Sequence, residues 1–189
     1  MDFVKDENIT EDEIVRGLAY HISSSVRSVT IPRTVLAEFE RDLMLITKSH
    51  YVHEYEIKRT RNDYAADFRK IIRFWERGVG YVPANKHRIL KGDDDRPTSW
   101  FQPASFTFVL PAGLMGDGEC VPGYCGLIEY ELSDKSWKRL EFKTKKKRPR
   151  LKRPDRLTPH QMYVLLSKME SRFWGAKETI KRLIEEKPE

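Results

Sequence analysis

The sequence predicts a mixed α/β (α+β) fold in which helices flank a central mixed β-sheet. Three observations support this prediction. A capped amphipathic pattern near the N-terminus indicates a first helix, two adjoining segments alternate apolar and polar residues as strands do, and a long helical pattern follows near the C-terminal end. The chain has 189 residues, of which 39% are hydrophobic, so it is long enough for one domain with its own core and a tail.

The composition narrows the class of protein. The formal net charge of +6 favours an anionic partner. Cys120 and Cys125 are too few for a disulfide framework, and no histidine lies near them at zinc-ligand spacing. The N-terminal residues 1–13 lack the apolar stretch of a signal peptide, and no run is long and apolar enough to cross a membrane. We therefore expect a protein of a reducing compartment without a membrane partner.

The first predicted element is a helix. Thr10 and Glu13 have the spacing of a capping box, and apolar residues then recur at helical spacing to about Ser24. Pro32 is expected to break the chain after a short extended stretch.

A β-hairpin is predicted next. Residues 39–47 and residues 51–58 each alternate apolar and polar side chains, and only three residues separate them. Segments of this kind, joined by so short a connection, are expected to pair as antiparallel strands.

Periodicity and the glycines predict the remaining elements of the core. An apolar stripe indicates a helix from Asp63 to the glycines near residue 78, and residues 82–102 lack periodicity and are predicted to form a loop. Three later segments read as strands. They are residues 105–110, 127–132 and 137–144.

Three parts make up the predicted domain organisation. Residues 1–142 form the core, residues 143–157 a basic linker segment, and residues 158–189 a C-terminal helical segment with proline at its first helical position. The basic segment either tracks a phosphate backbone or is a solvated linker. The last helix either packs against the core or forms a dimer contact.

The predicted hairpin carries the residues best suited to catalysis or metal binding. Alternate residues of a strand share a face, so Glu40 lies beside Asp42, and Glu54 and Glu56 lie beside Lys58. Carboxylates and an ammonium on one small surface suit metal-assisted attack on a phosphodiester. The alternative interpretation is a set of cross-strand salt bridges on a solvated face.

The order of Asp42, a hairpin and the triplet Glu56-Ile57-Lys58 resembles the signature of the PD-(D/E)xK nucleases, the restriction-endonuclease-like superfamily. This resemblance implies a restriction-endonuclease-like core, in which a mixed sheet has a helix on each side and the acidic residues lie on a central hairpin. The predicted order of elements agrees with that fold.

A longer match is more specific. Residues 56–70, EIKRTRNDYAADFRK, are similar to the pattern of small MmcB-like DNA-repair nucleases and their phage relatives. Residues 106–111 and 121–128 look like a later strand and turn of the same group, so the resemblance spans residues 41–130. Arg41 stands where many PD-(D/E)xK members have proline, but no predicted metal ligand is missing.

The resemblance implies a site for Mg²⁺ or Mn²⁺. Asp42, Glu56 and the backbone carbonyl of Ile57 would hold the metal, in keeping with the preference of hard cations for oxygen ligands. Lys58 would orient the attacking water or stabilise charge on the phosphate. A lysine beside two carboxylates stays protonated until metal arrives, which favours an electrostatic role over that of a general base.

Further residues are assigned on the same basis. Glu40 and Glu13 are candidate ligands of a second metal, and the alternative role of Glu13 is the helix cap. Basic residues after the triplet and in the basic segment are the expected nucleic-acid contacts. They are Arg59, Arg61, Lys70, Lys145, Lys146, Lys147, Arg148 and Arg150.

The first prediction of function is therefore a metal-dependent nuclease that hydrolyses DNA in repair, recombination or phage DNA processing, in a bacterial or phage-infected cytoplasm. The second is a non-cleaving nucleic-acid-binding protein that keeps the nuclease fold. The third is a small interaction protein that forms a homodimer or binds an acidic partner. Single-stranded, duplex and branched DNA, and RNA, present the same phosphate chemistry, so the substrate form and a targeting partner stay open.

Overall fold

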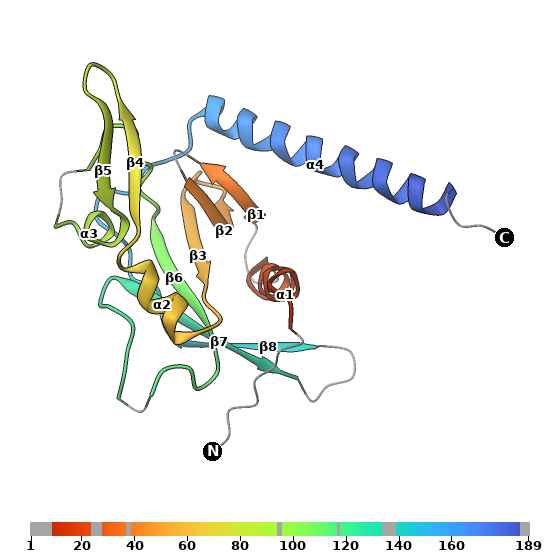
Figure 1. The fold of residues 1–189 in the computed structure, drawn as a ribbon, viewed down its shortest axis with the longest axis horizontal. Helices are drawn as coiled ribbons and strands as arrows, with labels where there is room; N and C mark the ends of the chain where they lie inside the picture. Colours follow the sequence, from red (N-terminus) through yellow and green to blue (C-terminus); the bar gives the residue numbers. More distant parts are fainter. Residues whose placement is uncertain are drawn as a thin grey trace. The chain divides into compact units, whose positions relative to one another are not determined.

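A computed structural model describes residues 9–23, 28–36, 39–93, 96–116, 118–133 and 139–185 (Figure 1). It is a mixed α/β structure, so the predicted class is confirmed. The chain divides into two compact units, residues 1–156 and residues 157–189. The first unit holds every strand, and the second holds one long helix. No helix among the described residues combines the length and the apolar character needed to cross a membrane.

Four helices and eight strands make up the described structure. The helices are α1 (Glu11–Ser23), α2 (Arg61–Asp67), α3 (Lys86–Lys91) and α4 (Pro159–Glu185). The strands are β1 (Ser28–Leu36), β2 (Phe39–Thr47), β3 (Val52–Ile57), β4 (Ile71–Glu76), β5 (Gly80–Asn85), β6 (Ser105–Pro111), β7 (Cys125–Leu132) and β8 (Leu140–Lys146).

Six of the strands form one mixed sheet in the order β1-β2-β3-β6-β7-β8, and β4 pairs with β5 in a separate two-stranded sheet. The β1–β2, β2–β3 and β7–β8 pairs are antiparallel, whereas β3, β6 and β7 run parallel. The predicted hairpin of β2 and β3 is confirmed, with Leu43 opposite Tyr55 and Ile46 opposite Val52. Parallel central strands need cover on both faces because they are buried on both.

Helices supply that cover, with α1 on one side of the sheet and α2 and α3 on the other (Figure 1). The buried stripe of α1, which includes Ile14 and Leu18, belongs to a core cluster with Tyr55 and Val109 of the sheet. Residues of α3 belong to a second cluster around the aromatic side chains of β6. The capping box of α1 is confirmed: the backbone N–H of Thr10 donates to Glu13 Oε2 at 2.8 Å.

Pro32 does not break the chain as predicted. It lies inside β1, opposite Leu43 of β2. Because β1 is the edge strand of the six-stranded sheet, a residue without an N–H can sit there and leave the pairing intact.

The predicted helix from Asp63 to residue 78 is wrong beyond its first two turns. The helix α2 ends at Asp67, and the chain then forms the β4–β5 hairpin. In β4 the buried residues Ile72 and Phe74 alternate with exposed ones, a period of two that the helical spacing of the apolar residues concealed. Gly78, with φ +83°, supplies the left-handed conformation of a tight hairpin turn.

The predicted loop over residues 82–102 is also wrong in its first half. Those residues complete β5 and form α3, which Asn85 caps by accepting the N–H of Arg88 at 3.0 Å. The helix ends at Gly92, whose φ of +87° suits a left-handed helix terminus.

The basic segment of residues 143–157 is not a free linker. Its first residues extend β8 to Lys146, and later ones pack on the core. Leu151 is buried and its N–H donates to the carbonyl of Ala104 at 2.9 Å, while Asp155 accepts the N–H of Gln102 at 2.8 Å. The division between the two units therefore follows Arg156. Residue 137, the predicted start of the last strand, lies outside the described residues.

A close approach of backbone to backbone fixes Gly126 in β7. A methyl group there would lie 2.9 Å from Arg148 Cα and 2.9 Å from Thr107 Oγ1. We expect Gly126→Ala to lower the free energy of unfolding by about 1–3 kcal/mol through overpacking. Chemical denaturation measures this, with Gly123→Ala as the control because a methyl group at Gly123 meets no atom within 4 Å. Equal stability of the two variants would contradict the prediction.

Candidate active site

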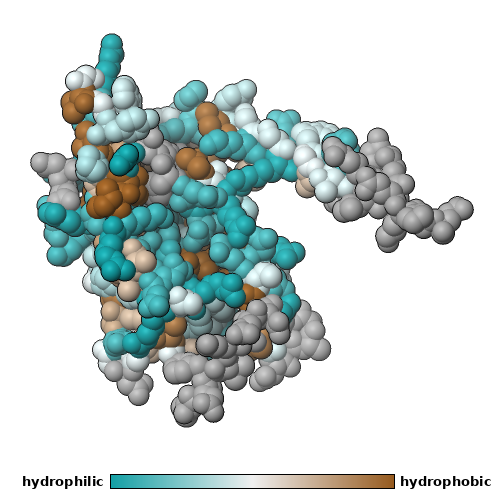
Figure 2. All heavy atoms as spheres, in the orientation of Figure 1, coloured by the Kyte–Doolittle hydropathy of each residue, from teal (hydrophilic) through white to brown (hydrophobic). Residues whose placement is uncertain are grey.

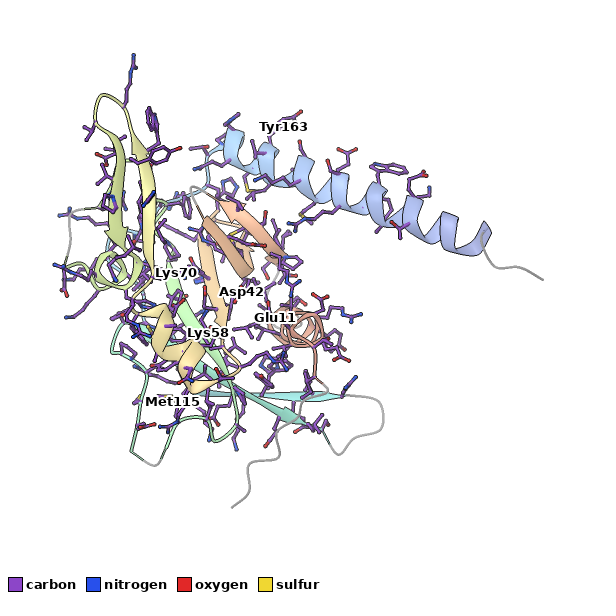
Figure 3. All side chains as sticks on the ribbon, viewed as in Figure 1. Glu11, Asp42, Lys58, Lys70, Met115 and Tyr163 are labelled. Carbon is purple, nitrogen blue, oxygen red and sulfur yellow. The ribbon has the colours of Figure 1, made fainter. Side chains whose placement is uncertain are left out.

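The β2–β3 hairpin and the residue that follows it bring together the three residues predicted to be catalytic, Asp42, Glu56 and Lys58. Asp42 and Lys58 are labelled in Figure 3. Asp42 Oδ2 accepts the backbone N–H of Ile57 at 2.7 Å, so the Asp42 carboxylate caps the end of β3. Lys58 Nζ donates to Glu56 Oε1 at 2.8 Å. The N–H and C=O of one strand residue point toward the same neighbouring strand, so the Ile57 carbonyl faces the side of Asp42.

Glu56 is the centre of a buried ion cluster. Its side chain is 3% exposed, and its second oxygen, Oε2, accepts from Lys86 Nζ at 2.8 Å. Lys70, at the start of the β4–β5 hairpin, lies 3.8 Å from Glu56 Oε1. Lysines from three parts of the chain therefore surround one carboxylate.

The cluster continues on the far side of Lys86. Lys86 is fully buried and also contacts Glu54 Oε1 at 2.9 Å, and Glu54 Oε2 accepts from Arg41 Nε at 2.9 Å. Positive and negative groups thus alternate from Arg41 to Lys58. Burial of charges on this scale is tolerated only where each has an opposite partner.

Asp67 and His87 join the same cluster from α2 and α3. Asp67 Oδ1 lies 3.3 Å from Lys58 Nζ, and Asp67 Oδ2 lies 2.6 Å from His87 Nε2. The other ring nitrogen of His87 lies 3.0 Å from the hydroxyl of Tyr124. Asp67 therefore gives the Lys58 ammonium a second carboxylate partner in addition to Glu56.

Burial and a neighbouring carboxylate raise the pKa of Asp42. Burial raises it most and the Glu56 carboxylate raises it further, while the Ile57 N–H and the Lys58 charge oppose them, and the pKa reaches about 7. The positive charges near Asp42, those of Lys58 and Arg33, therefore do not outweigh burial and the Glu56 carboxylate. A cation beside Asp42 would supply further positive charge.

The charged form is favoured at Lys58 and Lys86, whereas it is disfavoured at Asp42. Burial lowers the pKa of Lys58, but the carboxylates of Glu56, Asp67 and Asp63 outweigh burial and hold the pKa above its ordinary value. Burial and the carboxylates have the same opposed effects on Lys86, whose pKa is also raised. Both ammoniums stay protonated at neutral pH, so neither is a general base in this state.

The acidic residues predicted as extra metal ligands form no hydrogen bond or ion pair with Asp42 or Glu56 in the part of the chain that the structure describes. Glu13 accepts from Thr10 and forms an ion pair with Arg139, which is its capping role. Glu40 is exposed on β2. Glu11, which the sequence did not single out, is the residue of α1 whose charge reaches Asp42 and raises its pKa slightly.

The eight predicted nucleic-acid contacts have different surroundings. Lys146 and Arg148 are half-buried and the other six are exposed, and six of the eight contact other parts of the protein. Lys70 lies 3.8 Å from Glu56 Oε1. Arg61 pairs with Glu119, Lys145 with Glu129, Lys146 with the carbonyls of Val121 and Pro122, Arg148 with the Tyr55 hydroxyl, and Arg150 stacks on the Tyr51 ring.

Five residues of the cluster have no role in the prediction from sequence, namely Arg41, Glu54, Asp67, Lys86 and His87. Lys86 and His87 were read as loop residues, because their charged and polar character gives no sign of burial. Glu54 was placed on the correct face but given no function, and Asp67 fell on the family pattern without a role. The capping of α3 by Asn85 was the one local signal that a helix, and not a loop, carries Lys86 and His87.

The chemistry of the donors fits a hard divalent cation. Asp42 Oδ1 has no partner among the described residues, and each oxygen of Glu56 accepts from only one lysine within hydrogen-bond distance and keeps a further lone pair. With the Ile57 carbonyl, these are oxygen ligands of the kind that Mg²⁺ or Mn²⁺ takes. No preformed group of three or more histidine, cysteine or acidic side chains suited to a metal exists in the described parts of the chain, so waters or phosphate oxygens must complete the coordination.

Comparison with known proteins shows the fold alone. No family model and no curated protein matches this sequence. A solved structure of a protein of unknown function from Silicibacter pomeroyi is similar, with a TM-score of 0.52 and 14% sequence identity. The match covers 92% of this chain and 93% of the other. At this identity, the chain shares a fold with the Silicibacter protein and nothing is carried over about activity.

Proposed function

We propose that this protein is a nuclease of the PD-(D/E)xK type that hydrolyses DNA phosphodiester bonds with Mg²⁺ or Mn²⁺. The observation that carries the proposal is the Asp42 carboxyl group. It is partly buried beside Glu56, has a pKa raised to about 7, and is bonded to the N–H of Ile57. A carboxylate placed where its own charge is disfavoured is typical of a cation site.

The residues divide the chemistry among them. Asp42, Glu56 and the Ile57 carbonyl would hold the metal. When bound, a divalent cation neutralises charge at the phosphate and makes hydroxide available at neutral pH. Lys58, held by Glu56 and Asp67, presents a fixed positive charge to the oxygens of the phosphate, where charge develops in the transition state.

The architecture supports the same proposal. The resemblance implies a mixed sheet with helices on both sides and acidic residues on a central hairpin, and the described fold has those features. Lys70 lies next to the site and is exposed, so it can contact a phosphate of the substrate. A bacterial or phage-infected cytoplasm is the proposed setting, because the resembling nucleases work there.

One observation favours a second candidate, the non-cleaving nucleic-acid-binding protein. Both oxygens of Glu56 accept from lysines, and the charges of Lys58 and Lys86 oppose the approach of a divalent cation. In that case the cluster would serve stability, and DNA binding would depend on salt and not on metal.

A cleavage assay separates the two candidates. Labelled single-stranded, duplex, flap and junction DNAs and one RNA are incubated with wild-type protein in Mg²⁺, Mn²⁺ or EDTA. We expect metal-dependent cleavage of at least one substrate. Lys58→Ala should reduce it by about 10²–10³-fold, the cost of removing one group that stabilises transition-state charge.

Lys91→Ala is the matched control, because Lys91 is exposed and, among the residues that the structure describes, its ion pair is with Asp93 just after α3. It should cleave as wild type does. Absence of cleavage on every substrate, or equal cleavage by Lys58→Ala, would remove the nuclease proposal. Salt-sensitive binding without cleavage would support the second candidate.

A further inference from the structure

The β4–β5 hairpin has one face that the core does not cover. Along β4, Ile72 and Phe74 point into the core, while the residues between them are exposed. The exposed residues and their partners across β5 make up what we call the open face. It consists of Ile71, Arg73 and Trp75 of β4 and of their partners Asn85, Pro83 and Tyr81 of β5.

Two aromatic rings dominate the open face. Trp75 is 55% exposed and Tyr81 is 68% exposed, although they lie directly opposite each other in the pairing. Their ring centroids are 5.3 Å apart at 71°, an edge-to-face contact. Figure 2 shows hydrophobic and hydrophilic residues side by side over this hairpin, at the left of the view; tryptophan and tyrosine are not brown on this hydropathy scale, so the brown atoms there are not the two rings. Large exposed aromatic surface of this kind indicates a binding site.

The charge around these rings is positive. Arg69, Arg73 and Arg77 are exposed, and none of them forms an ion pair within the described residues. The acidic residue of the hairpin, Glu76, is engaged, because its carboxylate accepts the N–H of Thr98 at 3.0 Å. The open face therefore presents aromatic rings, and it and its two ends carry arginines without ion pairs among the described residues. Proteins that bind unpaired nucleic-acid strands combine aromatic rings and positive charge in this way.

The hairpin is also joined to the candidate active site at its base. Lys70 immediately precedes β4 and lies 3.8 Å from Glu56, and Lys86 immediately follows β5 and donates to the same carboxylate at 2.8 Å. The N–H of Lys86 also donates to the Lys70 carbonyl at 3.4 Å, which closes the base of the hairpin. The turn of the hairpin points away from α2 in Figure 1. A strand lying along β4 would thus run from the turn toward Glu56.

We propose that the open face binds a single-stranded segment of nucleic acid and delivers it to the site around Glu56. Bases stack on Trp75 and Tyr81, and Arg73 and Arg77 contact the phosphates. A six-residue strand is about 20 Å long, enough for a few nucleotides. The delivery step rests on the proposed nuclease function, whereas the binding step does not.

The test measures binding without cleavage. Full-length protein is titrated in EDTA against a fluorescein-labelled 20-nucleotide oligothymidine and against a labelled 20-base-pair duplex, and fluorescence anisotropy gives each Kd. We expect Trp75→Ala and Tyr81→Ala each to weaken oligothymidine binding about tenfold, the effect of losing one stacking ring. Binding to duplex should change by less than about twofold, since paired bases offer no free face to stack. Trp75→Phe should restore most of the affinity.

Tyr20→Ala is the matched control, because Tyr20 of α1 is 71% exposed and lies on another element. It should bind oligothymidine as wild type does. Unchanged oligothymidine binding by Trp75→Ala and Tyr81→Ala, or an equal loss on duplex, would overturn the inference. So would a change from dimer to monomer in sedimentation without weaker DNA binding, which would make the open face a contact between copies of this chain.

The two proposals fail in distinguishable ways. If the protein is not a nuclease, the cleavage assay is negative while the tenfold difference in oligothymidine binding remains. If the open face does not bind single strands, the affinities are equal whether or not the protein cleaves.

Discussion

Asp42→Asn is expected to make the metal-free protein more stable at pH 8 and to remove its metal-dependent activity. The folded state raises the pKa of Asp42 from 3.8 to about 7, so folding disfavours the ionised carboxylate. The protonated Asp42 carboxyl group therefore contributes fully to the free energy of unfolding below about pH 4, and this contribution is lost as the pH rises to about 7. Asparagine resembles the protonated form and can still accept the Ile57 N–H, so it avoids this loss.

The size and the pH dependence of the effect are both measurable. Chemical denaturation in EDTA should give Asp42→Asn an advantage of at least about 1 kcal/mol at pH 8, and none near pH 4. Glu40→Gln, a similar change at an exposed acid of the same strand, should alter stability by less than about 0.5 kcal/mol at either pH. If Asp42→Asn were less stable than wild type at pH 8, the carboxylate would have an unrecognised countercharge and the account of the site would be wrong.

Lys86→Met should be the most destabilising single substitution in the cluster. Lys86 is fully buried and contacts Glu54 and Glu56, which are 0% and 3% exposed. Methionine fills much of the same volume but leaves the two carboxylates without the cation that they share. Removing one partner from a buried ion pair costs about 3–5 kcal/mol, and we expect a loss in that range at pH 7.

The loss should shrink in acid, since protonation removes the charge of the two carboxylates that have lost a partner. Lys91→Met provides the control, because it is the same change in the same helix at an exposed ion pair, and it should cost less than about 1 kcal/mol. Urea denaturation at pH 5 and pH 7 measures both variants. Equal stabilities of the two would mean that the buried cluster contributes nothing through Lys86.

The spacing of apolar residues was sufficient to predict those elements of the fold whose sequence fitted either a helix or a strand, but not both. The capping box marked the start of α1, and two adjoining strand-like segments joined by three residues marked β2 and β3. That hairpin was enough to place Asp42 beside the triplet Glu56-Ile57-Lys58, so the centre of the candidate site was predictable from sequence. The contacts within 3 Å around Asp42 and Glu56 agree with that prediction.

The region after Asp67 could not be predicted in this way because two periods fitted it. Apolar residues from Tyr64 to Trp75 satisfy helical spacing, yet Ile72 and Phe74 also satisfy a period of two. Tertiary packing decided between them: burying Phe74 against Trp100 requires the strand. The sequence of β4 is rich in β-branched and aromatic residues, and this preference is the local signal that favoured the observed structure.

The partners of the proposed catalytic residues could not be predicted from the sequence, for a different reason. A buried lysine cannot be told from an exposed one by its own sequence, because its burial depends on acids that are distant along the chain. Lys86 is buried because Glu54 and Glu56 lie above it, 30 residues or more away in sequence, and His87 because Asp67 does. Such pairs become visible only when the topology is known.

Binding of Mn²⁺ to the wild-type protein and to Asp42→Asn, followed by electron paramagnetic resonance at pH 8, tests the central claim most directly. Wild type should bind Mn²⁺ saturably, with an affinity that falls about tenfold per unit as the pH drops below 7, because protons compete for Asp42. Asp42→Asn should lose this binding while it remains folded. Equal Mn²⁺ binding by both proteins, or none by wild type even with DNA present, would contradict a metal site at Asp42.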